Sequence, residues 1–273
     1  MGEGRLLVEA CQASTLDNFE NKKHQRLENE LRPLWRGIFR FDWRFGLFLI
    51  CILCVPRFVL VLNANATASY SSVGLLMVVS AIVPFVFLSK YGRIKIGTTK
   101  PKKYHALLIA FVSGLVFSVM LYFLGQILYG SSYENWYQYI GKSYNIPSEI
   151  TQSDRAVLFA IMALMGMTFS PIGEELFFRG IVHSSFEASI GERKASIVDS
   201  SAFAVTHISH FGLVFVNDGW DFFLTPTIIW VASMFLASRL FFVFKKYSGS
   251  LLGAIICHSA FKLGMIYCIF YCM

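Results

Sequence analysis

The chain has 273 residues, of which 55% are hydrophobic and only 15% are charged. Soluble domains carry about 25% charged residues, so this composition excludes an ordinary soluble protein and favours a membrane protein. The formal net charge of +7 does not indicate nucleic-acid binding. The positive residues cluster beside apolar stretches, where they mark the cytosolic side of a membrane protein.

Residues 1–45 are expected to form a basic and aromatic segment in the cytosol. The polar start of this segment is too long and too charged for a secretory signal. Arginine recurs at every fourth position before the first apolar stretch, at Arg32, Arg36, Arg40 and Arg44. A helix would align these arginines on one face, as in an interfacial helix on anionic headgroups. The alternative is that they simply flank the first span.

The apolar stretches that follow predict an all-α, polytopic bundle of about seven transmembrane spans, since a span needs about twenty apolar residues. We expect N-terminal transmembrane helices within 46–130, an extracytosolic loop over 131–155 and a catalytic core over 156–273. The expected spans cover 46–63, 73–89, 105–129, 156–181, 196–216, 222–244 and 249–271.

The charges of the loops orient this bundle. Lysines and arginines dominate residues 1–45, the loop 90–104 and the segments after the fourth and sixth expected spans, whereas the opposite loops carry mainly acids. The positive-inside rule therefore places the N-terminus in the cytosol and the C-terminus outside.

Three ionisable residues lie close together at expected membrane depth, in the sequence Glu174-Glu175-Leu-Phe-Phe-Arg179. Each charge costs roughly 2.5–3.5 kcal/mol at a helix centre, so these groups must turn inward, pair or take part in chemistry. Glu175 and Arg179 share a helix face and are expected to pair. Glu174 lies about 100° further round the helix and is free to point elsewhere. Pro171 frees a backbone carbonyl just before it, so we expect a kink there.

Two later spans each carry a histidine, His207 in SSAFAVTHISHF and His258 in GAIICHSAFKLG, where Lys262 follows one turn later. At 1.5 Å per residue, Glu174, His207 and His258 all lie roughly 13–18 Å from the expected cytosolic boundary. We therefore expect the three side chains to line one polar cavity that opens to the cytosol. His210 follows His207 by one turn, and the residues alone do not choose between these two histidines.

A glutamate with two imidazoles can activate water, because the glutamate accepts a proton while an imidazole orients the water or donates. Three classes of function stay open on the residues alone. The first is a glutamate-dependent protease without a cofactor. The second is a zinc protease with Glu174, His207 and His258 as ligands, although the chain has no His-Glu-x-x-His pair. The third is a non-catalytic membrane adaptor, immunity protein or transporter.

The order of these residues resembles that of a known family, the CAAX-processing and bacteriocin-processing membrane endopeptidases, called CPBP or Abi proteins. The resemblance covers about residues 155–272. Its three motifs here are Glu174-Glu175-Leu176-Phe177-Phe178-Arg179, Phe203-Ala204-Val205-Thr206-His207 and the segment that starts at His258.

The resemblance implies a glutamate-dependent intramembrane endopeptidase. Its substrate would be a peptide or a membrane-associated protein, including a prenylated CAAX-type protein, and it would need no cofactor. Glu174 would activate the water and His207 would assist. His258 would stabilise the oxyanion, while Glu175 and Arg179 would hold the site.

Lys262 departs from the family pattern, because the third motif is usually His-x-x-x-Asn or His-x-x-x-Asp. A lysine can still donate to an oxyanion, but it changes the charge beside Glu174. The family also includes immunity and scaffolding proteins, so a non-catalytic adaptor or bacteriocin-immunity protein is the main alternative. The implied partners are the substrate and the lipid bilayer, with no nucleic acid. The pattern does not predict an oligomeric state.

Overall fold

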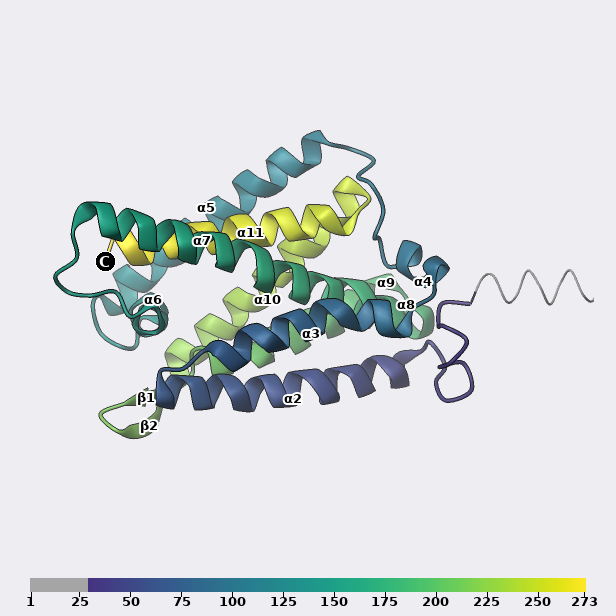
Figure 1. Cartoon of the computed structure of the whole chain (residues 1–273), viewed down its shortest axis with the longest axis horizontal. Coiled ribbons are helices and arrows are strands. Elements are labelled where there is room, and N and C mark those ends of the chain that lie inside the picture. Colours follow the sequence, from purple (N-terminus) through teal and green to yellow (C-terminus); the bar gives the residue numbers. More distant parts are fainter. Residues whose placement is uncertain (1–28) are drawn as a thin grey trace, which may run out of the picture.

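The computed structural model describes residues 29–273, so most of the expected N-terminal segment lies outside the described residues. The described part is a bundle of helices with one small β-hairpin (Figure 1), which confirms the all-α fold class. Its elements are α2 (Trp43–Thr67), α3 (Ser71–Phe87), α4 (Lys90–Lys95), α5 (His105–Tyr129), α6 (Trp136–Gly141), the 3₁₀ turn η1 (Lys142–Tyr144), α7 (Gln152–Glu174), the π-helix η2 (Glu175–Val182), α8 (His183–Ile190), α9 (Glu192–Thr206), the 3₁₀ turn η3 (His207–Ser209), β1 (Leu213–Val216), β2 (Gly219–Phe222), α10 (Leu224–Ser248) and α11 (Leu251–Tyr271).

Five of the described helices are long and apolar enough to cross a membrane, against about seven expected spans. They are α2, α5, α10, α11 and one continuous helix of 39 residues, Gln152–Ile190, which combines α7, η2 and α8. Helix α3 lies where the second span was expected and is a shorter apolar helix.

The expected span 196–216 is different in the structure. Helix α9 ends at Thr206, and a 3₁₀ turn and the β-hairpin follow. Two causes are visible. Polar residues of α9 such as Asp199 are buried against the protein, so this helix is not apolar on all faces. In addition, Asn217 and Asp218 both adopt positive φ angles, which is the geometry of a two-residue hairpin turn.

The expected arginine-lined helix is also absent from the described residues before α2, where the chain forms turns and an isolated bridge between Leu31 and Leu88. Pro33 disfavours a helical conformation at Arg32. The Nε atoms of Arg32 and Arg36 donate to the backbone carbonyls of Leu88 and Leu31, at 3.3 and 2.9 Å, instead of lying along one helix face.

Helix α11 is the most buried of the long helices and contacts α5, α7 and α10. Small residues let the helices approach closely, as is common between membrane helices. A Cβ on Gly114 of α5 would clash with the carbonyl of Cys257 on α11, and one on Gly173 of α7 would clash with the carbonyl of Met77 on α3. These two contacts lie beside His258 and Glu174.

The loops gather at two opposite ends of the bundle (Figure 1). At the first, here called the basic end, the loop 96–104 bonds to the α10–α11 turn, since Lys102 N donates to Ser248 O at 2.8 Å. The second, here called the hairpin end, holds α6, β1–β2 and the C-terminus. There the amide of Asn65 donates to Ser209 O at 2.8 Å. The basic loops that were expected on one membrane side thus share one end.

Candidate active site

Glu174 is the last residue of α7 and is almost completely buried, with 1% of its surface exposed. Its Oε1 atom accepts hydrogen bonds from Arg57 Nη2 of α2 at 2.9 Å and from Ser170 Oγ at 2.5 Å. Arg57 is itself only 5% exposed. One oxygen of the carboxylate is therefore held by a buried ion pair and a hydroxyl.

The other oxygen of Glu174, Oε2, has no hydrogen-bond partner among residues 29–273. It lies 3.8 Å from Nε2 of His207. The Nδ1 atom of His207 lies 2.7 Å from the backbone carbonyl of Phe203 and must carry a proton, because a carbonyl only accepts. In the neutral ring Nε2 is then an acceptor. Two acceptors at this distance can both receive hydrogen bonds from one water molecule.

Glu175 belongs to a second buried cluster. Its Oε2 atom lies 2.8 Å from Arg179 Nε, so the expected pairing is confirmed. Its Oε1 atom accepts from His258 Nδ1 at 2.7 Å. His258 is thus tied to the second glutamate, whereas His207 faces the first. The imidazole of His258 also stacks on Phe241, with ring centroids 4.5 Å apart.

Phe203 joins the two clusters. Its ring centroid lies 4.2 Å from that of His207 and 4.3 Å from Cζ of Arg179. The guanidinium of Arg179 therefore contacts the ring of Phe203 as well as the carboxylate of Glu175. A cation over an aromatic ring is a favourable cation–π arrangement. This contact explains why a bulky ring suits the first position of Phe-x-x-x-His here.

The helix that carries both glutamates departs from regular α geometry at two points. Pro171 has no N–H, so the carbonyl of Met167 loses its helical donor. Ser259 Oγ of α11 donates to that carbonyl at 2.6 Å. In the π-helix, Lys245 Nζ donates to the carbonyl of Arg179 at 2.5 Å. Side chains from α10 and α11 thus complete the backbone bonding of this segment, as helices at membrane depth require.

A small cavity of about 30 Å³ is lined by His207, His210, His258 and Lys262, together with apolar side chains. Its volume holds about one water molecule. Glu174 is not among its lining residues, so the expected cavity with all three groups in its wall is only partly present. Glu174 reaches the cavity through its 3.8 Å approach to His207.

Lys262 points into this cavity. It forms no hydrogen bond or ion pair with another described residue, but it is close enough to Glu174 and Arg57 to interact electrostatically. Its ammonium therefore has donors to spare within the site.

Arg57 is not among the residues that the sequence pattern predicts for the site. Its signal is an arginine in the middle of an apolar stretch, and the cost of a charge at membrane depth applies to it as it does to Glu174. His210, the alternative to His207 in the sequence, also joins the site, since its Nε2 lies 3.5 Å from Arg57 Nη2 and its ring lies beside that of His207. Arg57 and His210 come close to Glu174 and His207 only in the folded protein.

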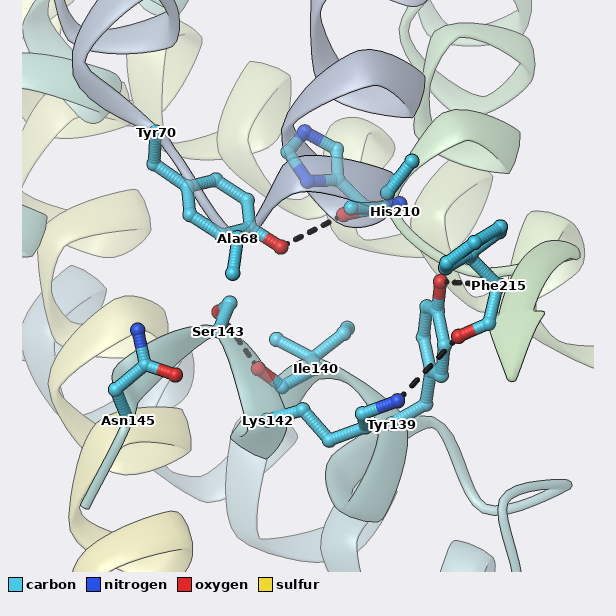
Figure 2. Close-up of a pocket in the computed structure, with 11 residues that line it drawn as sticks. Ala68, Tyr70, Tyr139, Ile140, Lys142, Ser143, Asn145, His210 and Phe215 are labelled. Atoms are coloured by element: carbon cyan, nitrogen blue, oxygen red, sulfur yellow. Dashed lines mark hydrogen bonds between the residues drawn. The ribbon is translucent and has the colours of Figure 1, made fainter. Parts of the chain in front are cut away.

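A larger pocket lies beside the small cavity (Figure 2). A pocket of about 240 Å³ shares Ile140 and His210 with the small cavity. It lies at the hairpin end, beside Phe215 of β1. By the positive-inside rule this end would be extracytosolic, and the expected opening of the cavity to the cytosol stays a prediction.

The donors around Glu174 bear on the alternative of a zinc site. Within residues 29–273, no three His, Cys, Asp or Glu side chains come together as metal ligands would. The guanidinium of Arg57 also occupies Oε1 of Glu174, so a cation bound by this carboxylate would face a fixed positive charge.

Comparison with known families agrees with the motifs. Residues 156–264 match the family model described as Rce1-like: Type II CAAX prenyl endopeptidase Rce1-like. This part of the chain is similar to that family. The match includes all three motifs and is consistent with the CPBP family. No curated protein and no solved structure matches the chain.

The Rce1-like match supports a protease, and with the five long apolar helices it indicates an integral membrane protein. The match covers less than half of the chain. Helix α2, which carries Arg57, lies outside it.

Proposed function

We propose that the protein is an intramembrane endopeptidase in which Glu174 activates the attacking water. The observation that carries this proposal is the free Oε2 atom of Glu174, buried and 3.8 Å from His207 Nε2. A water that donates one O–H to each atom is held with its oxygen lone pairs directed away from both, which is the orientation for attack on a carbonyl carbon.

In the proposed reaction, the water oxygen bonds to the carbonyl carbon of the scissile peptide bond while Glu174 takes one water proton. The carbonyl oxygen becomes the oxyanion of a tetrahedral intermediate. When the intermediate collapses, the C–N bond breaks and Glu174 returns the proton to the leaving amine. His207 orients the water throughout, because the Phe203 carbonyl fixes its ring.

Arg57 neutralises the buried carboxylate and keeps Oε1 occupied, so that Oε2 is the atom available to the water. Lys262 is the proposed donor to the oxyanion, because it lines the cavity and has no hydrogen bond to another described residue. His258 then supports the site indirectly, since its Nδ1 is committed to Glu175.

A groove between α3 and α7 favours a substrate that carries a lipid chain. It has a volume of about 440 Å³ and a mainly apolar lining that includes Met77, Met162 and Phe169, and Ser170 is also among its lining residues. Ser170 donates to Glu174, so a chain in this groove would lie one side chain away from the proposed base. We therefore propose a lipidated peptide or protein as the substrate, in keeping with the prenyl endopeptidase family that the core matches.

The proposal is tested by cleavage of a farnesylated peptide that ends in Cys-Val-Ile-Met, and of its non-farnesylated form, by purified protein in liposomes. Wild type should cleave the farnesylated peptide with the higher kcat/KM. Glu174→Gln should lose at least about a thousandfold in kcat, because the general base is gone. The matched control is Glu134→Gln, at an exposed glutamate of the hairpin end.

Size-exclusion profiles would establish that Glu174→Gln is folded. A folded Glu174→Gln protein that cleaves at the wild-type rate would rule out Glu174 as the base. Chelators should leave wild-type cleavage unchanged, whereas loss of cleavage with recovery on zinc addition would point to a zinc protease.

A further inference from the structure

The cations of the basic end differ in whether the protein itself pairs them. Lys95 Nζ lies 2.6 Å from Glu30 Oε1, and Lys246 Nζ lies 2.7 Å from Glu192 Oε1. The segment 97–105, which joins α4 to α5, is different, because it contains three lysines and no acidic residue. Its charge has no counterpart within the same loop.

The lysines of this segment lie beside two further polar side chains. Lys100, Lys102 and Lys103 are all exposed, and none forms an ion pair with another described residue. Lys103 Nζ lies 5.1 Å from the ring centroid of Tyr247, at the end of α10. The hydroxyl of Tyr247 lies 3.1 Å from Nε2 of His105. These five residues are here called the lysine cluster, and ammonium groups of this kind are common partners of phosphate oxygens.

The backbone of the lysine cluster is fixed to the rest of the fold. The amides of Lys102 and Lys103 both donate to Ser248 O, at 2.8 and 3.4 Å, and Leu251 N donates to Gly97 O at 2.9 Å. Figure 1 shows the connection from α4 to α5 passing beside the turn between α10 and α11. The fold therefore holds several like charges in one place, and their mutual repulsion is unfavourable. A bound anion would relieve this repulsion.

Apolar side chains adjoin the lysine cluster on both helices that carry it. On α5, Leu108 and Val112 are exposed and share a helix face with His105. On α10, Val243 is exposed and lies one turn before Tyr247. Helices α5 and α10 are in contact with each other. An acyl chain would cover such apolar faces, whereas a soluble phosphate ester would leave them bare.

We propose that the lysine cluster binds the headgroup of an anionic phospholipid, whose acyl chains lie along the exposed apolar faces of α5 and α10. By the positive-inside rule the basic end would be cytosolic, and the cytosolic leaflet is the one that carries anionic lipids. The inference goes beyond the proposed protease chemistry and does not depend on cleavage of any substrate.

This site differs from the one that the arginine spacing predicts. Arg32 and Arg36 donate to backbone carbonyls of the protein instead of lying along one helix face. The lysines at 100, 102 and 103 are exposed in a segment that the α10–α11 turn holds in place. The headgroup contact is thus assigned to the start of α5.

The test measures lipid binding to the purified protein in neutral detergent by native mass spectrometry. The probes are phosphatidylglycerol, phosphatidylcholine and glycerophosphoglycerol, which is the headgroup of the first without acyl chains. We expect wild type to bind phosphatidylglycerol at least about tenfold more tightly than phosphatidylcholine, since each lysine near an anionic lipid is worth roughly a fivefold gain. Glycerophosphoglycerol should bind more weakly than either lipid, because it covers no apolar surface.

A triple variant and a charge-matched control make the test specific to the cluster. Lys100→Gln, Lys102→Gln and Lys103→Gln combined should bind phosphatidylglycerol at least about tenfold more weakly than wild type does and lose the preference over phosphatidylcholine. The control combines Lys90→Gln, Arg193→Gln and Lys194→Gln, which removes the same charge at exposed residues outside the cluster. It should keep the preference.

Three results would each overturn the proposal. Equal affinities of wild type for the two lipids would show that the headgroup charge is not recognised. An equal loss of binding in both triple variants would show a general attraction between opposite charges and no site at the cluster. Binding of glycerophosphoglycerol as tight as that of the lipid would assign the cluster to a soluble phosphate ester. Circular dichroism would establish that both variants are folded.

Discussion

Replacing Arg57 tests the contact that the sequence did not predict. Arg57→Met leaves Glu174 as a buried carboxylate without its cation, 2.9 Å from the position of the lost nitrogen. Breaking a buried ion pair by removing one partner costs about 3–5 kcal/mol, mainly because the other charge stays buried and unpaired. We expect the free energy of unfolding to fall by about this amount.

A double variant checks the predicted loss of unfolding free energy. Arg57→Met combined with Glu174→Gln removes both charges, and replacing a whole buried pair is often close to neutral. The double variant should therefore recover most of the stability that Arg57→Met loses, a coupling of about 2–4 kcal/mol in a double-mutant cycle.

The assay is denaturation in mixed micelles, followed by tryptophan fluorescence. Arg44→Met is the control, since Arg44 lies on the same helix but is exposed, and surface charges are worth about 0–1 kcal/mol. The reasoning is refuted if Arg57→Met costs less than Arg44→Met, or if the double variant is no more stable than Arg57→Met alone.

Three further predictions concern the second cluster, the oxyanion and the topology. Glu175→Gln should lower stability and yield by breaking the contacts to Arg179 and His258, and an unchanged unfolding free energy would contradict this structural role. Lys262→Met should lower kcat about 10²–10³-fold, as loss of an oxyanion donor does, whereas Lys262→Asn should keep or raise it. Identical rates in all three proteins would place Lys262 outside the site. Single cysteines introduced at Ser131 and Lys100 should react with impermeant reagents from opposite sides of the membrane, and labelling from one side would overturn the orientation.

The parts of the site that the sequence predicted are those set by local helix geometry. Glu175 and Arg179 are four residues apart, so a shared helix face was enough to predict their pairing. The same geometry left Glu174 to point elsewhere. Its main partner Arg57 is 117 positions away in the chain, and no periodicity relates two helices at that separation. Only packing of α2 beside the end of α7 reveals the pair.

The sequence predicted the all-α fold class but not every element of the fold, because hydropathy also describes only local sequence. Hydropathy finds long apolar helices reliably, and residues 29–273 form five such helices. A hydropathy window also assigns the apolar residues of β1 to the end of a span, because it takes no account of the residues that favour a turn. The turn Val216-Asn217-Asp218-Gly219 carries a sequence signal for a hairpin, which an apolar window of twenty residues conceals.

The continuous helix Gln152–Ile190 has a consequence for how the protein sits in its membrane. Its 39 residues extend about 58 Å at 1.5 Å per residue, roughly twice the thickness of a hydrocarbon core of about 30 Å. The helix must therefore tilt or project beyond the core, and its degree of hydrophobic mismatch depends on the bilayer. Because Glu174 is carried on this helix, a thicker or thinner membrane changes the depth of Glu174, and with it the depth at which the substrate of the proposed reaction would present its scissile bond. For the proposed endopeptidase, lipid composition would thereby become a variable in substrate selection.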